Sequence, residues 1–580
     1  MGDINMVSER DKKVIFKIIG AALAVFIIVL IITGPDIFKI IQGIIDGTNT
    51  TTIDPDKIVS KLDEIVSTIN VNTVTHLPYT NIPQPLDTID TLPDIKSEYP
   101  PQVNESTPSY IEIFSSTEKA GSGTDGWLTE VAKDFNDAAI MIDGKQVSVR
   151  LRGIPSGQGA DYITSRKYLP DAYTPSNELW GEIIVSRGAK AQLVQKRLAG
   201  NVAGILLTKS KKDELTAKYG TINIKTIIDA VTNNELLMGY TDPFTSSTGL
   251  NFLLSALQTS NSSNLFSDKT KAGSKSFQAN IPIVAITTLE LKNKAISGDL
   301  DCLILEYQTY MNTPEIRSYE FIPFGVRHDS PMYAIGELSA DKMKILNKFV
   351  EFTQQEKYQA LATRYGFNGL NEYQAEGESV SGDVIIQAQK LWKDTKETGK
   401  DICAVFVADV SGSMDGEPLN NLRRSLINGQ YYIGKDNLIG LISYSKDVNI
   451  DLPIAKFDLK QRSLFAGAVR DLQAGGSTST FDAIAVAMKM LVDQKAVGPD
   501  ADPNLKPKIF LLSDGNSNTG HSAEDIRGIA KALGMPIYTI GYNANLPELI
   551  EIAGWNEAVC INADTEDVVY KLKNLFIITL

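Results

Sequence analysis

The chain has 580 residues, of which 43% are hydrophobic and 22% charged, as in a globular protein with several domains. Seventy acidic residues against 56 basic ones give a net charge of −14. This charge argues against a general nucleic-acid binder, because phosphate contacts need clustered Lys and Arg. Three cysteines and three histidines are too few and too scattered for a disulfide framework or a histidine-rich zinc enzyme.

Near the N-terminus, residues 14–33 form an uninterrupted apolar stretch apart from Lys17, VIFKIIGAALAVFIIVLIIT. It is long enough to span a bilayer, and Lys17 lies near one end, where its amine can reach the interface. The basic sequence ERDKK precedes it, so the positive-inside rule predicts a cytoplasmic tail at 1–13 and an extracellular location for the rest. A cleavable signal peptide is the alternative, but no small-x-small cleavage pattern follows the stretch. We therefore expect an uncleaved, single-pass signal anchor in the cell membrane.

Residues 34–107 combine one short amphipathic stretch, DKIVSKLDEIV, with a tract in which prolines recur from Pro83 onwards. Proline stiffens the chain and removes amide donors. We interpret this region as a semi-extended stalk or linker that gives the following domains reach.

Residues 108–380 alternate β-rich apolar runs with longer amphipathic ones, which predicts parallel βαβ units with ligands bound beyond the carboxyl ends of the strands. Hydroxyl-bearing side chains gather at four of these ends. A single cluster is more simply a helix N-cap, but caps alone need not converge on one cleft. The candidate ligand-binding residues are Ser115, Ser116, Thr117, Ser156, Tyr173, Ser176, Ser246, Ser247 and Thr248.

The same region resembles the type II periplasmic, or extracellular, solute-binding proteins of bacterial transporters. The resemblance rests on IEIFSSTEKAG, RGIPSGQGADYI, PDAYTPSNELWGEII, GYTDPFTSSTGLNFL and KFVEFTQQEKYQALATRYGFNG. It implies two α/β lobes joined by a two-stranded hinge that close over a ligand. The hydroxyl-rich loops favour a small oxyanion or another polar solute. Arg327 and Asp329 either line this cleft or form a surface ion pair.

After a helical connector at 381–399, residues 400–580 show a second α/β alternation, which predicts a doubly wound sheet. Oxygen-bearing side chains again stand at the strand ends, in DVSGSM, GGSTST and LLSDGN. Two carboxylates balance a divalent charge, and hydroxyls add ligands without adding charge, so the set suits Mg²⁺, with Mn²⁺ or Ca²⁺ as alternatives. The candidate metal ligands are Asp409, Ser411, Ser413, Thr478 and Asp514.

These residues resemble the metal-ion-dependent adhesion site (MIDAS) of the von Willebrand factor A (VWA) domains. The resemblance implies that Ser411, Ser413 and Thr478 hold the ion directly and that Asp409 and Asp514 act through water. Water or a partner's carboxylate would complete the ligand shell. Nearby acidic residues are expected to be solvated, namely Asp415, Glu417 and Asp482.

Catalytic motifs are weak by comparison. GQYYIGKD has Asp436 where a P-loop needs Ser or Thr, and it precedes a strand rather than a helix. The serines of DVSGSM lack a nearby histidine base. The sequence therefore predicts a binding protein and not an enzyme.

The expected architecture is α/β: an N-terminal transmembrane helix, a bilobed periplasmic-binding-protein-like domain and a doubly wound, Rossmann-like VWA domain. The expected function is capture of a small polar solute or oxyanion, combined with Mg²⁺-dependent binding of a protein or surface ligand that offers a carboxylate. Two alternatives stay open. One is the solute-binding component of a transport system, and the other is an accessory subunit of a metal-chelatase or ATPase complex.

Overall fold

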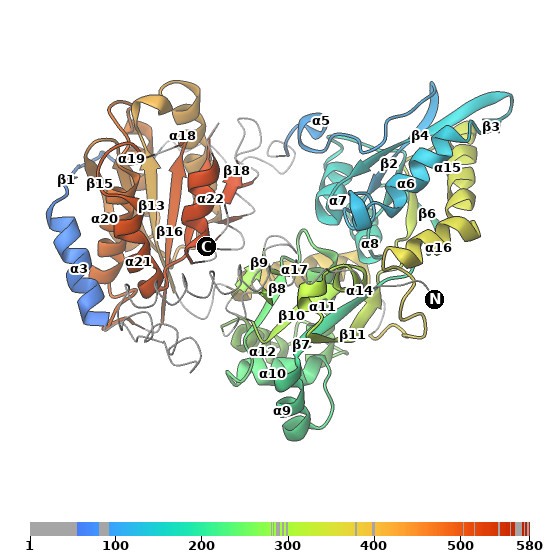
Figure 1. The fold of residues 1–580 in the computed structure, drawn as a ribbon, viewed down its shortest axis with the longest axis horizontal. Helices are drawn as coiled ribbons and strands as arrows, with labels where there is room; N and C mark the ends of the chain where they lie inside the picture. The colour runs from blue at the N-terminus through green and yellow to red at the C-terminus, as the bar shows by residue number, and fades with distance from the viewer. Residues whose placement is uncertain are drawn as a thin grey trace, which may run out of the picture. The chain divides into compact units, whose positions relative to one another are not determined.

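The computed structural model describes residues 55–580 apart from 81–91, 563–570 and shorter stretches within 280–299, 378–379, 397–400 and 503–580. The predicted membrane anchor at 14–33 lies outside the described residues. Within the described part of the chain, no helix is both long and apolar enough to cross a bilayer. The described strands form three sheets with helices between them (Figure 1), in agreement with the predicted α/β class.

The first sheet and its helices form lobe 1 of the central region, with the strand order β3-β4-β2-β5-β12-β6. Strand β2 lies between β4 and β5, parallel to both, and is buried on both faces. Ile111 and Ile113 face the core shared with α6, α15 and α16, whereas Phe114 belongs to the core shared with α7 and α8. Such two-sided burial explains why parallel strands read as apolar runs. The elements are β2 (Ser109–Ser115), α6 (Trp127–Asp137), β3 (Met141–Ile142), β4 (Lys145–Gly153), α7 (Ser156–Ser165), β5 (Ala172–Thr174), α8 (Leu179–Ser186), β6 (Ala191–Gln195), β12 (Met332–Ile335), α15 (Ala340–Thr353) and α16 (Glu356–Arg364).

The second sheet forms lobe 2, with the order β11-β7-β10-β8-β9. The chain passes between the lobes at 196–201 and returns at 328–331, which matches the predicted two-stranded hinge. Among the described residues, the elements of lobe 2 are β7 (Val202–Thr208), α9 (Lys209–Tyr219), α10 (Ile224–Thr232), β8 (Met238–Thr241), α11 (Ser247–Ser260), α12 (Asp268–Ala279), β9 (Ile283–Ala285), β10 (Cys302–Glu306), α14 (Tyr307–Met311) and β11 (Tyr319–Arg327).

The third sheet defines the C-terminal domain, with the order β1-β15-β14-β13-β16-β17-β18. Strand β13 is central and parallel to β14 and β16, and its Phe406 packs against the rings of Phe465, Phe510 and Phe576. The doubly wound sheet is therefore as predicted, with an antiparallel strand, β15, added beside β14. The elements are β13 (Asp401–Asp409), α18 (Glu417–Gly429), β14 (Leu438–Tyr444), β15 (Val448–Lys456), α19 (Leu459–Asp471), α20 (Thr480–Asp493), β16 (Leu505–Ser513), α21 (Ala523–Leu533), β17 (Ile537–Gly541), α22 (Leu546–Gly554) and β18 (Cys560–Asn562).

Part of the predicted stalk is folded rather than extended. Strand β1 (Val71–Thr73) pairs in parallel with β15, and helix α3 (Pro55–Ser67) precedes it. Asp63 forms an ion pair of 3.0 Å with Lys489, and Leu62 is fully buried. The amphipathic stretch needs a partner for its apolar stripe, and the C-terminal domain supplies one.

The central region is consequently an insertion between two strands of the same sheet, β1 and β13. The connector predicted at 381–399 is helix α17 (Gly382–Lys396), which packs against α8, α11 and α12. It is part of the bilobed core and contributes Ile385, Ala388, Leu391 and Trp392 to it.

Candidate metal centre and solute cleft

Four of the five predicted metal ligands come from the carboxyl ends of two neighbouring strands. Asp409 ends β13, Ser411 and Ser413 follow in a short turn at Gly412–Met414, and Asp514 follows β16 directly. Because β13 and β16 are adjacent and parallel, these ends meet at one edge of the sheet. The edge is where ligands bind in doubly wound folds.

The side-chain oxygens of three of these residues are in contact. Ser413 Oγ donates a hydrogen bond of 3.0 Å to Asp514 Oδ1 and lies 3.2 Å from Ser411 Oγ. Asp409 lies behind them, fully buried, and accepts hydrogen bonds from the Ser411 amide at 2.8 Å and from Ser513 Oγ at 2.6 Å. Asp409 therefore fixes the turn that presents the two serines.

The fifth predicted ligand, Thr478, lies on a loop that packs against this turn. The Gly412 amide donates to the Gly476 carbonyl at 3.0 Å, and the Gly475 amide donates to the Val410 carbonyl at 2.8 Å. The Thr478 hydroxyl itself contacts Asn518 Nδ2 at 3.5 Å. The structure thus brings the Thr478 loop to the cradle formed by Asp409, Ser411, Ser413 and Asp514.

The cradle has the electrostatic character of a cation site. Burial raises the pKa of the Asp409 carboxyl, and the nearby charge of Asp514 raises it further. Burial also raises the pKa of Asp514. A divalent ion would offset this cost of holding two carboxylates away from water, and hydroxyls with carboxylates are the oxygen donors that Mg²⁺ prefers. The described residues contain no group of three or more His, Cys, Asp or Glu placed to hold a metal, so any ion here would depend on the serine hydroxyls.

Of the three nearby acidic residues, Asp482 differs from the expectation of a solvated residue. Asp415 and Glu417 are exposed as expected, but Asp482 is buried. Its Oδ1 accepts a hydrogen bond from the His521 amide at 2.9 Å and lies 2.6 Å from His521 Nδ1. Asp482 therefore braces the loop before α21.

The cleft between the lobes contains charged residues as well as the predicted hydroxyls. Lys119 is fully buried, and its ammonium donates to Ser116 Oγ, to Glu118 Oε1 at 3.3 Å and to the Pro175 carbonyl at 3.3 Å. Burial by itself would raise the pKa of Glu118, but Lys119, Ser116 and Ser176 together lower it. Glu118 and Lys119 thus form an ion pair in lobe 1.

Lobe 2 and the hinge contribute a second buried carboxylate. Glu306 ends β10, and its Oε1 lies 2.7 Å from Nδ1 of the hinge residue His328, while its Oε2 accepts a hydrogen bond of 2.9 Å from Asn201. Burial raises the pKa of Glu306, and the charge of Glu118 raises it further. The two carboxylates are therefore close enough to repel each other.

The tautomer of His328 follows from its two amide neighbours. Nε2 lies 3.1 Å from Nδ2 of both Asn177 and Asn251. The Oδ1 of Asn177 accepts from the Leu179 amide, and that of Asn251 accepts from the Val326 amide, so both Nδ2 groups are donors. Nε2 must then be an acceptor, and the ring proton lies on Nδ1, facing the carboxylate.

The two lobes contact each other directly through the predicted clusters. Trp180 Nε1 of lobe 1 donates to Ser247 Oγ of lobe 2 at 2.9 Å, and the Gly157 amide donates to the Thr245 carbonyl at 3.2 Å. Asn177 Nδ2 adds a hydrogen bond of 3.3 Å to the Ser247 carbonyl. The structure is therefore that of a closed cleft.

The remaining predicted residues have mixed roles. Ser156 and Ser176 are buried neighbours in lobe 1, and the Tyr173 hydroxyl donates to the Ser156 carbonyl. Ser246 is the N-cap of α11, and its hydroxyl lies 2.9 Å from that of Thr248, so this cluster is the helix N-cap that was the simpler alternative. The others are placed as follows: Ser115 donates to the Ser116 carbonyl, Thr117 is exposed, and Arg327 pairs with Asp329 at 2.9 Å at the end of β11.

Sequence reasoning missed Glu118, Lys119, Glu306 and His328. Glu306 was detectable in principle, because it is the only charged residue in the strand CLILE and stands at its carboxyl end. His328 carried no such signal, since its partners Asn177 and Asn251 lie 151 and 77 residues away.

Two α/β lobes around a closed polar cleft, followed by a doubly wound sheet with an oxygen cradle, define a bilobed binding-protein-like fold joined to a doubly wound α/β fold. Family models agree. The model "Bacterial extracellular solute-binding protein" matches residues 119–368, and the model "von Willebrand factor type A domain" matches residues 404–575. The chain therefore has a solute-binding-protein domain followed by a VWA domain.

Relatives and solved structures cover one domain at a time. Inter-alpha-trypsin inhibitor heavy chain H3 of Bos taurus is 30% identical over 152 residues, which are 24% of this chain and 16% of that protein. Iron-bound HitA from Pseudomonas aeruginosa is 14% identical with a TM-score of 0.36, covering 50% of this chain and 99% of that one. A von Willebrand factor type A protein from Catenulispora acidiphila is 15% identical with a TM-score of 0.28, covering 31% and 42%.

Proposed function

We propose that this protein is a membrane-anchored, extracellular and non-catalytic binding protein with two ligand sites. The VWA domain binds a divalent cation, Mg²⁺ by preference, and through it a carboxylate of a protein or surface ligand. The solute-binding domain captures a small polar solute. The observation that carries this proposal is the contact of the Ser411, Ser413 and Asp514 oxygens above the buried Asp409 carboxylate.

In this function Ser411, Ser413 and Thr478 would hold the ion with Asp514, while Asp409 keeps the turn in place. When bound, the ion supplies an electrophilic point to which an acidic group of a partner can bind. The Ser413–Asp514 hydrogen bond holds the serine hydroxyl at the cradle. Ser513 and Tyr444 donate to Asp409 and limit its movement.

Mn²⁺ titration of the full chain, followed by electron paramagnetic resonance, tests the cation site. We expect Asp514→Asn to weaken Mn²⁺ binding at least about tenfold, which corresponds to about 1.4 kcal/mol. Asp415→Asn is the matched control, because Asp415 is an exposed carboxylate beside the same turn. Equal Mn²⁺ affinity in the wild type and Asp514→Asn would contradict the proposal.

The charges in the cleft favour a solute that carries N–H donors. Lys119 is already paired with Glu118, and Glu306 adds a second carboxyl group, which faces Nδ1 of His328. An oxyanion placed among these groups would meet two carboxylates. We therefore propose an amine-bearing solute in place of the oxyanion that the hydroxyl-rich loops alone favoured.

A thermal-shift panel on the full chain separates these classes. Lysine and spermidine serve as amine probes, and sulfate and molybdate as oxyanion probes. We expect an amine to raise the melting temperature of the wild type and to lose this effect in Glu306→Gln. Stabilisation by the oxyanions alone would contradict the amine assignment.

The extracellular location is tested on intact cells that carry the full chain. We expect added protease to cleave the VWA domain, at residues 400–580, without lysis. Protection of that domain until lysis would contradict the proposed topology and favour a cytoplasmic accessory role.

A further inference from the structure

Residues 75–79, here called the clasp segment, follow β1 and lie against helix α19 of the VWA domain. The Tyr79 amide donates a hydrogen bond of 2.8 Å to the Ser463 carbonyl. The Leu77 carbonyl approaches Gly467 so closely that a Cβ at this position would clash with it, so the contact requires glycine here. Since β1 already pairs with β15, the clasp segment carries the attached chain from the sheet onto the helix.

His76 of the clasp segment lies between two carboxylates of the VWA domain. Its Nε2 is 2.9 Å from Asp451 Oδ1 of β15, and its Nδ1 is 3.3 Å from Asp471 Oδ2 of α19. Ionised carboxylates only accept hydrogen bonds, so each ring nitrogen must carry a hydrogen if the ring is to bond both. The geometry therefore requires the doubly protonated, positively charged imidazolium.

Burial makes the charge of this histidine important. The side chains of His76 and Asp451 are only 9% and 4% exposed. Asp451 Oδ2 is buried and has no hydrogen-bond partner among the described residues, so the imidazolium is the cation that compensates this carboxylate. Asp471 is more exposed, and its Oδ1 lies 3.4 Å from the guanidinium of Arg470. Arg470 is a further charged group facing the clasp segment, since it also lies over the ring of Tyr79.

Loss of one proton from His76 weakens this bridge. A neutral imidazole has one N–H, so it can donate to only one of the two carboxylates. Its other nitrogen then presents a lone pair to a carboxylate, and no positive charge remains between Asp451 and Asp471. The stability that the bridge contributes is therefore present at low pH, where the imidazolium forms, and is lost as the pH rises and the proton leaves.

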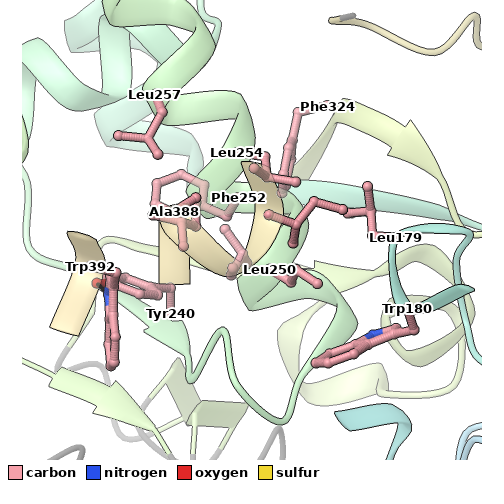
Figure 2. Close-up of a cluster of buried hydrophobic side chains, with 14 of the residues drawn as sticks. Leu179, Trp180, Tyr240, Leu250, Phe252, Leu254, Leu257, Phe324, Ala388 and Trp392 are labelled. Carbon is pink, nitrogen blue, oxygen red and sulfur yellow. Dashed lines mark hydrogen bonds between the residues drawn. The ribbon is translucent and has the colours of Figure 1, made fainter. Parts of the chain in front are cut away.

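Helix α17, which ends the inserted bilobed domain, is held in a different way. Its Ala388 and Trp392 are buried in an apolar cluster with Tyr240 and Leu250 of lobe 2 (Figure 2). Apolar packing of this kind does not depend on a proton that is exchanged near neutral pH. Of these two segments at the ends of the insertion, the clasp segment is therefore the one expected to respond to pH.

We propose that His76 is a pH-sensitive clasp: its imidazolium holds residues 75–79 on the VWA domain, and its deprotonation releases them while β1 stays paired with β15. Release would free five residues, which extend to about 17 Å and lengthen the chain between the VWA domain and lobe 1. Any effect of this slack on solute or partner binding rests on the proposed function, whereas the clasp itself needs neither ligand.

Hydrogen exchange of the full chain, followed by mass spectrometry, measures the release. The Tyr79 amide is protected by the Ser463 carbonyl, and the Val74 amide by a bond of 3.0 Å to the Ile450 carbonyl beside β1. We compare about pH 5.5 with about pH 8.5, which bracket the ordinary pKa of histidine. After correction for intrinsic exchange, the Tyr79 protection factor should fall at least about tenfold at the higher pH, as expected for the loss of one charged hydrogen bond, while that of Val74 stays unchanged.

His76→Gln separates this histidine from the other titrating groups. The glutamine amide can still donate to Asp451 but carries no charge, so the Tyr79 amide should be weakly protected at both pH values. His328 and His521 remain in this variant, so their titration is retained. An unchanged Tyr79 protection factor in the wild type, or an equal pH-dependent loss in His76→Gln, would overturn the inference. An equal loss at Val74 would show that β1 leaves as well and would contradict release beyond β1 alone.

Gly467→Ala supplies an arm that does not depend on titration. The added methyl group cannot fit against the Leu77 carbonyl, so the Tyr79 amide should lose protection at both pH values. Gly528→Ala is the matched control, because Gly528 lies on helix α21 and a Cβ there meets nothing within 4 Å. Equal Tyr79 protection in the two variants would show that the clasp segment is not held against α19. A chain that fails to bind Mn²⁺ would remove the proposed cation site and leave these protection factors as they are.

Discussion

The proposed cation cradle and the cleft between the lobes are both built at strand ends, yet they are assembled differently. The cradle takes Asp409, Ser411 and Ser413 from one turn and Asp514 from the adjacent parallel strand. The cleft instead joins Glu118 of lobe 1, Glu306 of lobe 2 and the hinge residue His328. A site made by neighbouring strands of one sheet can be located from spacing, whereas a site made by a hinge depends on how two lobes meet.

The largest expected loss of stability comes from removing a buried charge in the bilobed region. Arg152 is 2% exposed and donates two hydrogen bonds to Glu112 Oε1, at 2.9 and 2.7 Å. Arg152→Met leaves Glu112 Oε1 without its two guanidinium donors, although Arg150 still lies 3.5 Å from Oε2, and we expect it to lower the free energy of unfolding by about 3–5 kcal/mol. Urea denaturation measures this. Arg187→Met removes a more exposed pair with Asp161 and should cost no more than about 1 kcal/mol. Similar losses of unfolding free energy in both variants would show that burial does not make the Arg152–Glu112 pair more important for stability.

A smaller loss is expected where the lobes meet. Asn177→Ala removes the hydrogen bond to the Ser247 carbonyl and one donor to His328. His328 keeps its donor from Asn251, but the Leu179 amide loses its acceptor and a hydrogen bond between the lobes is lost, which costs about 1–3 kcal/mol and favours the open cleft. Small-angle scattering should show a larger radius of gyration than in the wild type. Thr117→Ala is the control: Thr117 is an exposed residue of the same lobe, and its replacement should leave the radius of gyration unchanged. An unaltered radius in Asn177→Ala would show that these contacts do not hold the lobes together.

Within the VWA domain, Ser413→Ala should cost less in stability but more in cation binding. It removes one hydrogen bond to Asp514, worth about 0.5–1.5 kcal/mol. We expect 5 mM Mg²⁺ to raise the melting temperature of the wild-type VWA domain and to have a reduced effect on Ser413→Ala, as measured by calorimetry. EDTA supplies the metal-free reference for each variant. If Mg²⁺ stabilised both equally, the serine could not be a ligand.

The smallest effect is expected for an ion pair of helix α3, in the packed part of the predicted stalk. Asp63→Asn breaks an exposed ion pair with Lys489, which contributes about 0–1 kcal/mol. Leu62→Ala, in contrast, empties a fully buried site and should cost about 2–5 kcal/mol. Thermal unfolding of the two variants compares them. Equal and negligible losses would mean that α3 does not stabilise the VWA domain.

The strands of both regions were largely predictable because parallel strands are apolar runs with polar ends. ICAVFVADVS and YIEIFSS become β13 and β2. Strand β1 was not predictable, because three residues, VNT, carry no periodic signal and depend on pairing with β15. The amphipathic stretch before it, at 56–66, was recognised, but its packing against the distant VWA domain was missed because a periodic pattern does not identify its partner.

The candidate sites differ in the same way. Local spacing placed Asp409, Ser411 and Ser413 together, although Ser413 lies in the short turn at Gly412–Met414 and Asp409 lies behind the two serines. Ser246 and Thr248 were predicted to bind the ligand, but their hydroxyls instead lie in the N-cap of α11. The ion pair of Glu118 and Lys119 was hidden within an ordinary charged loop, and only burial in the closed cleft distinguishes it.

Strand β1 has a practical consequence for work on the VWA domain. A fragment that begins at residue 401 would lack β1 and leave the backbone groups of β15 unpaired on its outer side. Open edges of this kind recruit strands from other molecules and promote aggregation. A well-behaved fragment would carry residues 59–79 ahead of β13, joined by a short flexible loop in place of the two lobes.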